Sequence, residues 1–233
     1  MTGLLTLALP VAWTVNISRM LLTGVEPAHR FHQATGQGLL LLAVWLGGLL
    51  PLLLAGWRGQ RPSSAAGLRH LAFVVVGAAC AVAAPGGGAP SLTVIITITG
   101  ALLWLALPVR PRLRWPVRID PVLAPVALAV TAWLSTYAAS QVTLQNHAVG
   151  YHARNPHFFD MAWLVLVLAV LGLAGAGLAG ARRLLVWPAV GCVWIGAAGL
   201  AFGEAVTWSV VTLAAGVVVG GALLLRRRIS RDA

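Results

Sequence analysis

The sequence predicts an all-α fold, a polytopic bundle of transmembrane helices that forms a single domain over residues 1–233. Composition is the first reason. Hydrophobic residues make up 59% of the 233 residues and charged residues only 9%, whereas an ordinary soluble domain has about 25% charged residues. So few charges cannot cover a water-exposed surface. They also gather in short runs between long apolar stretches, as in a membrane protein.

Eight apolar segments qualify as membrane spans, because a bilayer core about 30 Å thick needs about 20 residues of helix. They cover approximately 3–23, 38–57, 70–85, 91–109, 121–144, 161–180, 184–203 and 207–225. The third segment is short, and Asn16, Ser18 and Arg19 interrupt the first. The pattern predicts eight spans with both termini inside. Seven spans with an external N-terminus are the alternative.

The positions of the arginines predict how the chain is oriented in the membrane. All 16 basic residues are arginine, and the spans above place most of them on one side. These are Arg58, Arg61, Arg69, Arg110, Arg112, Arg114, Arg118, Arg182, Arg183, Arg226, Arg227, Arg228 and Arg231. By the positive-inside rule this side, with the C-terminus, is cytoplasmic. Short arginine runs are not the continuous basic face of a nucleic-acid-binding protein. We therefore expect the lipid bilayer, and no nucleic acid, as the partner.

The histidines have the opposite distribution. Five of the 6 fall on the outer side, and three carboxylates join them. The first group of these residues is Glu26-Pro27-x-His29-x-x-His32. Pro27 suits the first position of a helix. We therefore expect the second helix to begin there and to carry Glu26, His29 and His32 on one face.

The second group is His147-x4-His152-x4-His157-x2-Asp160. Asn155 followed by Pro156 is a helix-start signal. It predicts that His157 and Asp160 lie side by side in the first turn of a helix. His147 and His152 then belong to the preceding loop.

Together the two groups predict a transition-metal site. Imidazole is the commonest metal ligand in proteins, and a carboxylate serves as a ligand or as the partner that orients an imidazole. Met20 and Met161 fall at the same boundary, and thioether with imidazole favours copper. The predicted metal-site residues are Glu26, His29, His32, His147, His152, His157 and Asp160. The alternative is that these histidines are ordinary polar residues of the membrane interface.

A polar stripe runs along the outer half of the fifth segment, where Tyr137, Gln141 and Gln145 are spaced by four. Polar groups at membrane depth normally face a bundle interior or a wet cavity. The stripe predicts either a polar vestibule below the histidines or hydrogen bonds between helices.

Other residues have structural explanations. Tryptophans near segment ends, such as Trp57 and Trp163, are expected to anchor helices at the interface. Asp120 lies among the cytoplasmic arginines and is expected to balance their charge. Cys80 and Cys192 lie midway along apolar segments, which favours buried thiols over a disulfide.

Residues 43–50 read AVWLGGLL. This string resembles the VWLGGLL segment of the CopD family of bacterial copper-resistance membrane proteins. The resemblance implies eight spans and a role in copper handling at the bacterial cell membrane. The family's histidine about two turns before the tryptophan falls near Gly38 in this sequence, and His32 lies farther upstream. The resemblance therefore supplies no metal ligand.

These observations predict an integral membrane protein that binds a transition metal, with copper favoured, at its outer face. The metal would be transported or delivered to a membrane or periplasmic partner protein. One alternative is a membrane-bound, metal-dependent oxidase or hydroxylase that uses the same residues. Another is a haem-binding or accessory subunit of a membrane redox complex. The sequence leaves open whether the protein is an enzyme.

Overall fold

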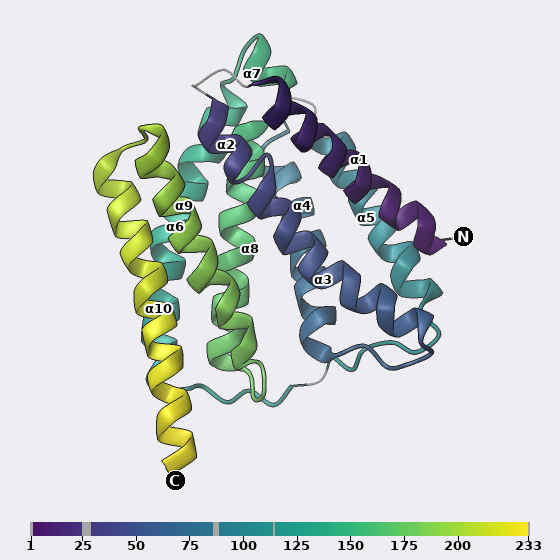
Figure 1. The fold of residues 1–233 in the computed structure, drawn as a ribbon, viewed down its shortest axis with the longest axis vertical. Coiled ribbons are helices and arrows are strands. Elements are labelled where there is room, and N and C mark those ends of the chain that lie inside the picture. Colours follow the sequence, from purple (N-terminus) through teal and green to yellow (C-terminus); the bar gives the residue numbers. More distant parts are fainter. Residues whose placement is uncertain (1, 25–28, 86–88, 114, 233) are drawn as a thin grey trace. The chain divides into compact units, whose positions relative to one another are not determined.

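A computed structural model of the chain describes residues 2–24, 29–85, 89–113 and 115–232 (Figure 1). Every regular element over these ranges is helical, which confirms the all-α prediction. The elements are α1 (Thr2–Thr23), α2 (Arg30–Ala34), α3 (Leu39–Trp57), α4 (Ser64–Ala83), α5 (Ala89–Ala106), α6 (Leu123–Asn146), α7 (Tyr151–Arg154), α8 (His157–Gly177), the 3-10 helix η2 (Arg182–Leu185), α9 (Val186–Phe202) and α10 (Val206–Asp232).

Each predicted apolar segment coincides with a long helix, and the structure has the helices of a multi-pass membrane protein. Six stretches of the described chain are long and apolar enough to cross a bilayer. They are Arg30–Trp57, Ser64–Ala83, Leu123–Asn146, His157–Gly177, Arg182–Phe202 and Val206–Arg227. A shorter apolar stretch, Val94–Ala106, belongs to α5. Helix α1, with its polar Asn16 and Arg19, is not among the six.

Helix α4 corrects the short third segment. The sequence predicts a start at residue 70, but the helix begins at Ser64 and has 20 residues. Ser63 caps it, because its side-chain oxygen accepts a hydrogen bond from the backbone N–H of Ala66 at 3.2 Å. A side-chain cap satisfies one of the N–H groups left open by the first helical turn. Arg69 and His70 therefore lie inside the helix and not at its edge.

The chain divides into two compact units. Unit 1 comprises Met1–Leu113 and Ala138–Leu164, and unit 2 comprises Arg114–Tyr137 and Val165–Ala233. Helices α6 and α8 contribute residues to both units. The predicted metal-site residues that the structure describes, all except Glu26, belong to unit 1. The predicted single domain over residues 1–233 stays a prediction.

Buried aromatic side chains form the core of unit 1. Trp45 of α3 stacks on Phe73 of α4 with ring centroids 5.6 Å apart, and Phe73 contacts Trp163 of α8 at 4.5 Å. The Trp163 indole N–H donates to the Phe73 carbonyl at 2.8 Å. The expected anchor role of Trp163 is therefore wrong, because its ring faces α4, where Gly77 leaves room for it. Trp57, 86% exposed, fits the interface prediction.

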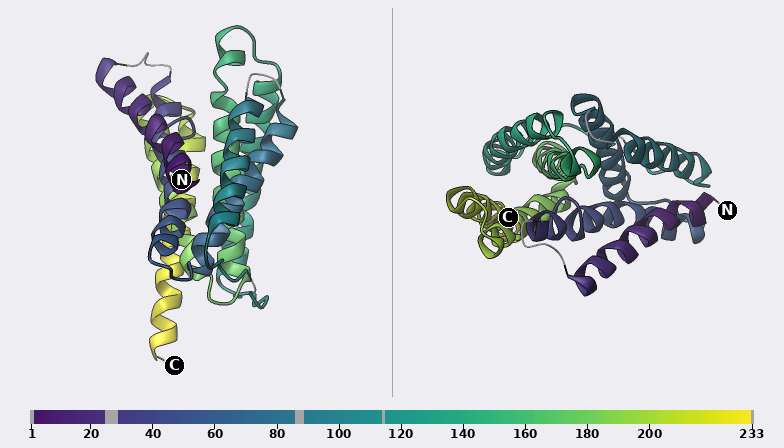
Figure 2. Two further views of the ribbon diagram at one scale, coloured as in Figure 1. Left: turned by 90° about the vertical axis from the view of Figure 1, so that its right-hand side faces the viewer. Right: turned by 90° about the horizontal axis from the view of Figure 1, so that it is seen from above.

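The helices α9 and α10 form the hairpin of unit 2, and they run side by side in the views of Figures 1 and 2. Gly203 ends α9 in the left-handed conformation with φ 82°, which suits glycine because it has no Cβ. Along the hairpin the two backbones come close. A Cβ on Gly196 would lie 2.5 Å from the Ser209 carbonyl oxygen. Small residues at such an interface let two helix backbones approach closely.

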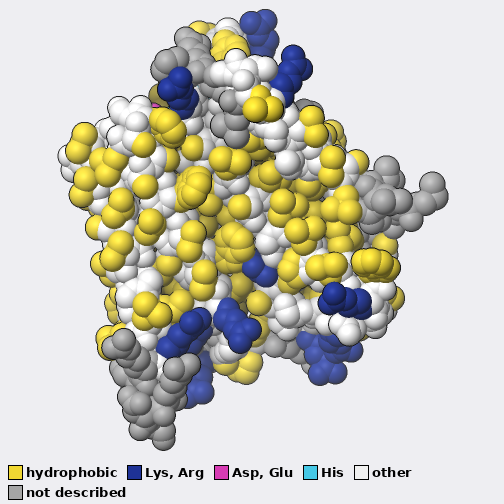
Figure 3. All heavy atoms as spheres, viewed as in Figure 1, with side chains coloured by type: hydrophobic (Ala, Val, Ile, Leu, Met, Phe, Trp, Pro, Cys, Tyr) yellow, Lys and Arg dark blue, Asp and Glu magenta, His cyan; other side chains and the backbone are white. Residues whose placement is uncertain are grey.

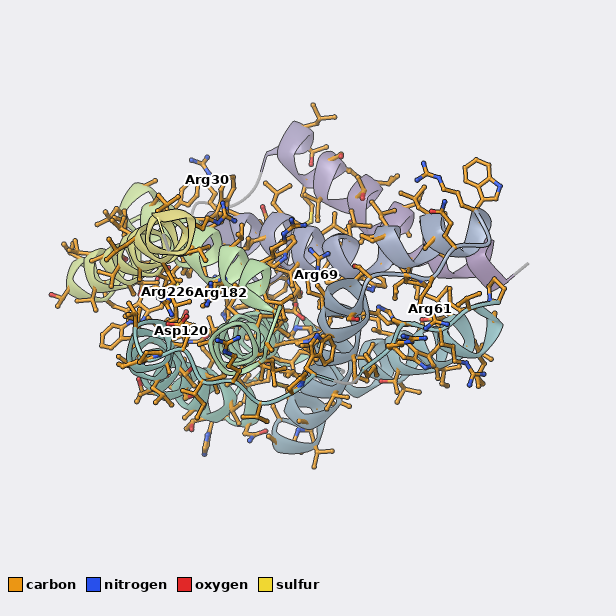
Figure 4. All side chains as sticks on the ribbon, turned by 90° about the horizontal axis from the view of Figure 1, so that it is seen from below. Arg30, Arg61, Arg69, Asp120, Arg182 and Arg226 are labelled. Atoms are coloured by element: carbon orange, nitrogen blue, oxygen red, sulfur yellow. The ribbon has the colours of Figure 1, made fainter. Side chains whose placement is uncertain are left out.

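Asp120 joins the polar ends of three helices in unit 2. Its Oδ1 accepts hydrogen bonds from the backbone N–H groups of Val122 and Leu123 at 3.1 and 3.3 Å, at the start of α6. Its Oδ2 lies 2.9 Å from Nε of Arg226 and 3.1 Å from Nη2 of Arg182. Figure 4 shows the three labelled side chains converging. The expected role of Asp120 in charge balance is confirmed.

The pKa of the Asp120 carboxyl follows from these contacts. Burial alone would raise it, but the hydrogen bonds from Arg226 and the two backbone amides, together with the charge of Arg226, hold the pKa below the ordinary 3.8. A carboxylate with a lowered pKa stabilises the folded state above the unfolded pKa, and this contribution is lost as the pH falls through the folded pKa.

We therefore expect Asp120→Asn, which keeps an oxygen for the helix start but removes the charge, to lower stability at pH 7. The loss should be about 1 kcal/mol, because solvation of both guanidinium groups limits the strength of the two ion pairs. The difference from the wild type should shrink as the pH falls below the unfolded value of 3.8. Thermal unfolding in detergent at several pH values measures it. A difference that stays constant between neutral and acid pH would contradict this account of Asp120.

Candidate functional site

Two distant stretches of unit 1 bring four histidine rings together. His29 and His32 come from the start of α2, and His152 and His157 come from α7 and the first residue of α8. The ring centroids of His32 and His157 lie 4.6 Å apart, and those of His152 and His157 lie 4.8 Å apart. The His29 ring lies 5.5 Å from His157 and 5.9 Å from His152. We call these four residues the histidine cluster.

The closest polar contact within the histidine cluster joins His152 and His157. Nδ1 of His152 lies 3.1 Å from Nε2 of His157. His152 is exposed, His29 and His32 are half-buried, and His157 is only 3% exposed. The cluster therefore reaches from the protein surface to the buried start of α8.

The start of α8 confirms one local prediction. The helix begins at His157, directly after Asn155 and Pro156, and His157 and Asp160 share its first turn. Proline restricts the residue before it to extended conformations, and Asn155 has φ −117° and ψ 93°. The chain therefore turns sharply between α7 and α8, which sets His152 against His157.

Gln145, near the end of α6, holds this turn in place. Its side-chain oxygen accepts a hydrogen bond from the backbone N–H of Phe159 at 3.2 Å, and its amide nitrogen donates to the His152 carbonyl at 3.3 Å. The residue is 1% exposed. The sequence predicts that the polar stripe either lines a vestibule or forms hydrogen bonds between helices. Gln145 does the latter.

The loop between α2 and α3 packs directly on α8. The Met161 sulfur accepts a hydrogen bond from the Gly36 backbone N–H at 3.2 Å. It also lies 3.0 Å from the Thr35 hydroxyl, which donates to the Phe31 carbonyl at 2.7 Å. A Cβ on Gly36 would lie 2.7 Å from the backbone nitrogen of Met161. Only a residue without a side chain allows the loop this close. The contact brings the His29–His32 stretch against the start of α8.

A second set of hydrogen bonds links the same loop to α7. Gln37 donates to the side-chain oxygen of Asn155, and Asn155 donates to the Tyr151 hydroxyl at 2.7 Å. The Tyr151 ring lies 5.2 Å from the His29 ring. Sequence reasoning missed Gln37 and Tyr151. Their nearness to Asn155 depends on the packing of α2 and α7 and is not encoded in local spacing.

Two polar atoms at the start of α8 are buried without a hydrogen-bond partner in the described chain, namely His157 Nδ1 and Asp160 Oδ1. Asp160 is 4% exposed and lies one helical turn after His157. Buried polar groups are almost always paired with protein, water or an ion. Each of the two open atoms therefore leaves room for a partner such as an ordered water molecule or an ion.

Other predicted site residues lie apart or elsewhere. His147 is exposed, its Nδ1 is 2.8 Å from the Thr143 carbonyl, and no ring contact joins it to the histidine cluster in the described structure. Glu26 lies outside the described residues. Glu204, an outer-side carboxylate that was not among the predicted ligands, lies between α9 and α10 in unit 2, where burial raises the pKa of its carboxyl.

The second helix differs from the expectation. His32 lies in the five-residue helix α2, His29 is the residue before it, and α3 begins separately at Leu39. A single helix running from Pro27 into the membrane is therefore wrong. Thr35 and Gly36 leave the helical path so that the loop can contact Met161.

The donor atoms of the histidine cluster are not already arranged as a complete metal site. Within the part of the chain that the structure describes, no three His, Cys, Asp or Glu side chains are placed so that they could hold one metal ion. The Met161 sulfur is occupied by Thr35 and Gly36. Metal binding would require the imidazole rings to rotate toward one another.

Comparisons with known proteins do not identify a family. No family model matches the chain, and no match was found among the curated proteins or the solved structures. The resemblance of residues 43–50 to the CopD family therefore stays an expectation from the sequence.

We expect Gly36→Ala to destabilise the protein by about 1–3 kcal/mol, because the added methyl group must displace the Met161 backbone in a close-packed region. Thermal unfolding in detergent measures the loss. Gly221→Ala is a suitable control, since nothing lies within 4 Å of a Cβ at that position of α10. Equal stability of the two variants would contradict the role given to the Gly36 contact.

Gln145→Leu should cost about 1–3 kcal/mol, because it leaves the Phe159 N–H and the His152 carbonyl without their partner. The Phe159 amide should also exchange its hydrogen faster. Gln141→Leu is the matched control, since the Gln141 side-chain oxygen is buried without a hydrogen-bond partner in the described chain. Unchanged protection of Phe159 in the Gln145 variant would refute this role.

Proposed function

We propose that the protein binds a transition-metal ion, with copper favoured, at the histidine cluster formed by His29, His32, His152 and His157. The ion would be transported across the membrane or delivered to a membrane or periplasmic partner protein. The observation that carries the proposal is the convergence of four imidazole rings from two stretches of chain more than a hundred residues apart.

The contact between His152 and His157 has the spacing of two ligands of one ion. With metal–nitrogen distances of about 2.0–2.1 Å, neighbouring nitrogens lie about 2.9 Å apart in a square-planar site and about 3.3 Å apart in a tetrahedral site. The observed distance is 3.1 Å. The same spacing suits a hydrogen bond between neutral imidazoles, so the pair also has a favourable metal-free arrangement.

The two polar atoms at the start of α8 that have no partner in the described chain leave room for a cation or a water molecule. A protein group left buried without a partner costs about 1–3 kcal/mol, and both His157 Nδ1 and Asp160 Oδ1 are in this state. A metal ion near His157 would attract the Asp160 carboxylate, either directly or through an imidazole that the carboxylate orients.

The donor set narrows the choice of metal. The Met161 thioether, which the sequence suggested as a soft donor, is held by Thr35 and Gly36. Imidazole nitrogens are then the main donors, and among divalent ions such a set binds Cu²⁺ most strongly. The proposal therefore shifts from a mixed sulfur and nitrogen site toward a nitrogen site for Cu²⁺.

The proposed membrane arrangement has eight spans in the bacterial cell membrane, with the C-terminus cytoplasmic and the histidine cluster outside. Helix α3 supports this direction within unit 1. It follows the histidine-bearing α2 and ends beside Arg58, and its 19 residues span about 28 Å. This length matches a bilayer core of about 30 Å.

Metal binding is tested on the purified full chain in detergent. After loading with Cu²⁺ or Zn²⁺ and removal of free ions, elemental analysis should find about one ion per chain, with copper held more tightly. Changing a group that merely orients a ligand weakens metal binding about 10–100-fold, so losing a ligand in His152→Ala or His157→Gln should weaken it by at least about 100-fold.

His147→Ala is the matched control, because this exposed histidine belongs to the same loop but has no ring contact with the cluster in the described structure. It should bind copper like the wild type. Negligible copper in the wild type, or an equal loss in the His147 and His152 variants, would overturn the proposal.

The proposed roles give different results once binding is established. A transporter moves the ion across sealed vesicles, and the resemblance to CopD favours this role in copper handling. An oxidase or hydroxylase retains the ion while it consumes an organic substrate. A haem protein shows a Soret band in its visible spectrum, and an accessory subunit purifies with a stable partner and without metal.

A further inference from the structure

A basic cavity of about 630 Å³ lies at the ends of four helices in unit 2. Its lining includes Arg118, Asp120, Arg182, Arg183 and Arg226. These residues precede α6, follow α8 and belong to α10. Figure 3 shows basic side chains close to the C-terminal end of α10, with hydrophobic side chains over the helices above them.

A rigid backbone frame forms one wall of the cavity. The backbone N–H groups of Arg118 and Asp120 donate to the carbonyls of Gly177 and Ala176, each at 2.9 Å. The N–H of Ala179 donates to the Pro116 carbonyl at 3.0 Å. These bonds tie the segment before α6 to the end of α8. The backbone bearing Arg118 is therefore held in place.

All hydrogen-bond acceptor positions of Asp120, the single carboxylate among the described residues that line the cavity, are occupied. Asp120 accepts two backbone N–H groups at Oδ1 and contacts the guanidinium groups of Arg182 and Arg226 at Oδ2. A carboxylate offers about four acceptor positions, and all four are taken. It therefore has no acceptor position left for Arg118 or Arg183.

The cavity keeps a surplus of positive charge. Four arginines face one carboxylate, and neither Arg118 nor Arg183 has an ion-pair partner among the residues that the structure describes. Guanidinium groups bind phosphate through paired hydrogen bonds, which makes arginine the usual residue for phosphate recognition. Arg118, whose backbone is held by hydrogen bonds, and the two arginines that contact Asp120 therefore place guanidinium groups around the cavity.

We propose that this cavity binds a phosphate group through the guanidinium groups of Arg118 and Arg183. The contacts of Asp120 with Arg182 and Arg226 hold the cavity wall in place. The phosphate is either the head group of an anionic phospholipid or a free phosphate ester. Basic pockets between the cytoplasmic ends of membrane helices are suited to anionic head groups. Val117 and Ile119, on either side of Arg118, are 77% and 67% exposed and offer apolar contact beside the cavity.

The test uses the full chain in detergent micelles that contain either phosphatidylcholine or phosphatidylglycerol, with inorganic phosphate as a third additive. The melting temperature is measured against additive concentration, because a ligand of the folded state raises it. Phosphatidylglycerol should stabilise the wild type more than phosphatidylcholine. The double variant Arg118→Gln/Arg183→Gln, which leaves both Asp120 ion pairs in place, should need on the order of 30-fold more phosphatidylglycerol.

The control removes the same number of charges elsewhere. Arg58→Gln/Arg61→Gln changes two exposed arginines of unit 1 and should respond like the wild type. If inorganic phosphate alone stabilises the wild type and this effect is lost in Arg118→Gln/Arg183→Gln, the cavity binds phosphate from a soluble source. The proposal is overturned if neither phosphate source stabilises the wild type, or if the two double variants respond equally.

Discussion

The close contact between Gly36 and Met161 is the constraint on which the histidine cluster depends. It is the point where the loop after α2 lies directly on the backbone of α8, with the Met161 sulfur accepting a hydrogen bond from the Gly36 N–H. Together with the hydrogen bond between Gln37 and Asn155, this approach sets His29 and His32 beside His152 and His157. Met161, whose thioether favoured copper in the sequence analysis, also holds the loop that carries the residues of the proposed site.

The polar residues of the two units illustrate two ways of handling charge next to a membrane. In unit 2 the Asp120 carboxylate fills its acceptor positions with two amides and two arginines. In unit 1, His157 Nδ1 and Asp160 Oδ1 are buried without a hydrogen-bond partner in the described chain. Gln145 and Asn155 nearby do form hydrogen bonds. A satisfied network gives structural stability, whereas a buried polar group without a protein partner leaves room for water or an ion.

Much of the architecture could be predicted because a bilayer imposes simple length and polarity rules. The apolar segments, the α8 start at Asn155–Pro156 and the charge-balancing role of Asp120 all follow from local pattern. The start of α4 could not be predicted in this way, because the polar Arg69 and His70 resemble loop residues. The helix begins earlier, after the cap at Ser63. Trp163 was misread because its nearness to a helix end is visible in the sequence, whereas its partner Phe73 is not.

The histidine cluster shows where such prediction ends. Clustering on one side of the membrane pointed to His29, His32, His152 and His157, but His147 has the same local pattern and lies apart from their rings. What separates them is tertiary packing through Gly36, Gln37 and Gln145. Gly36 and Gln37 look ordinary in the sequence, and the polar stripe marked Gln145 without revealing its partners. Local spacing also suggested one long helix from Pro27, whereas the loop contact with Met161 requires a break between α2 and α3.

The central claim is that one ion is shared by the rings of this cluster, and X-ray absorption spectroscopy of the protein loaded with one equivalent of Cu²⁺ tests it most directly. The account predicts a first shell of nitrogen at about 2.0 Å with the outer-shell scattering of roughly three or four imidazoles. A shell of oxygen with one imidazole or none would contradict it.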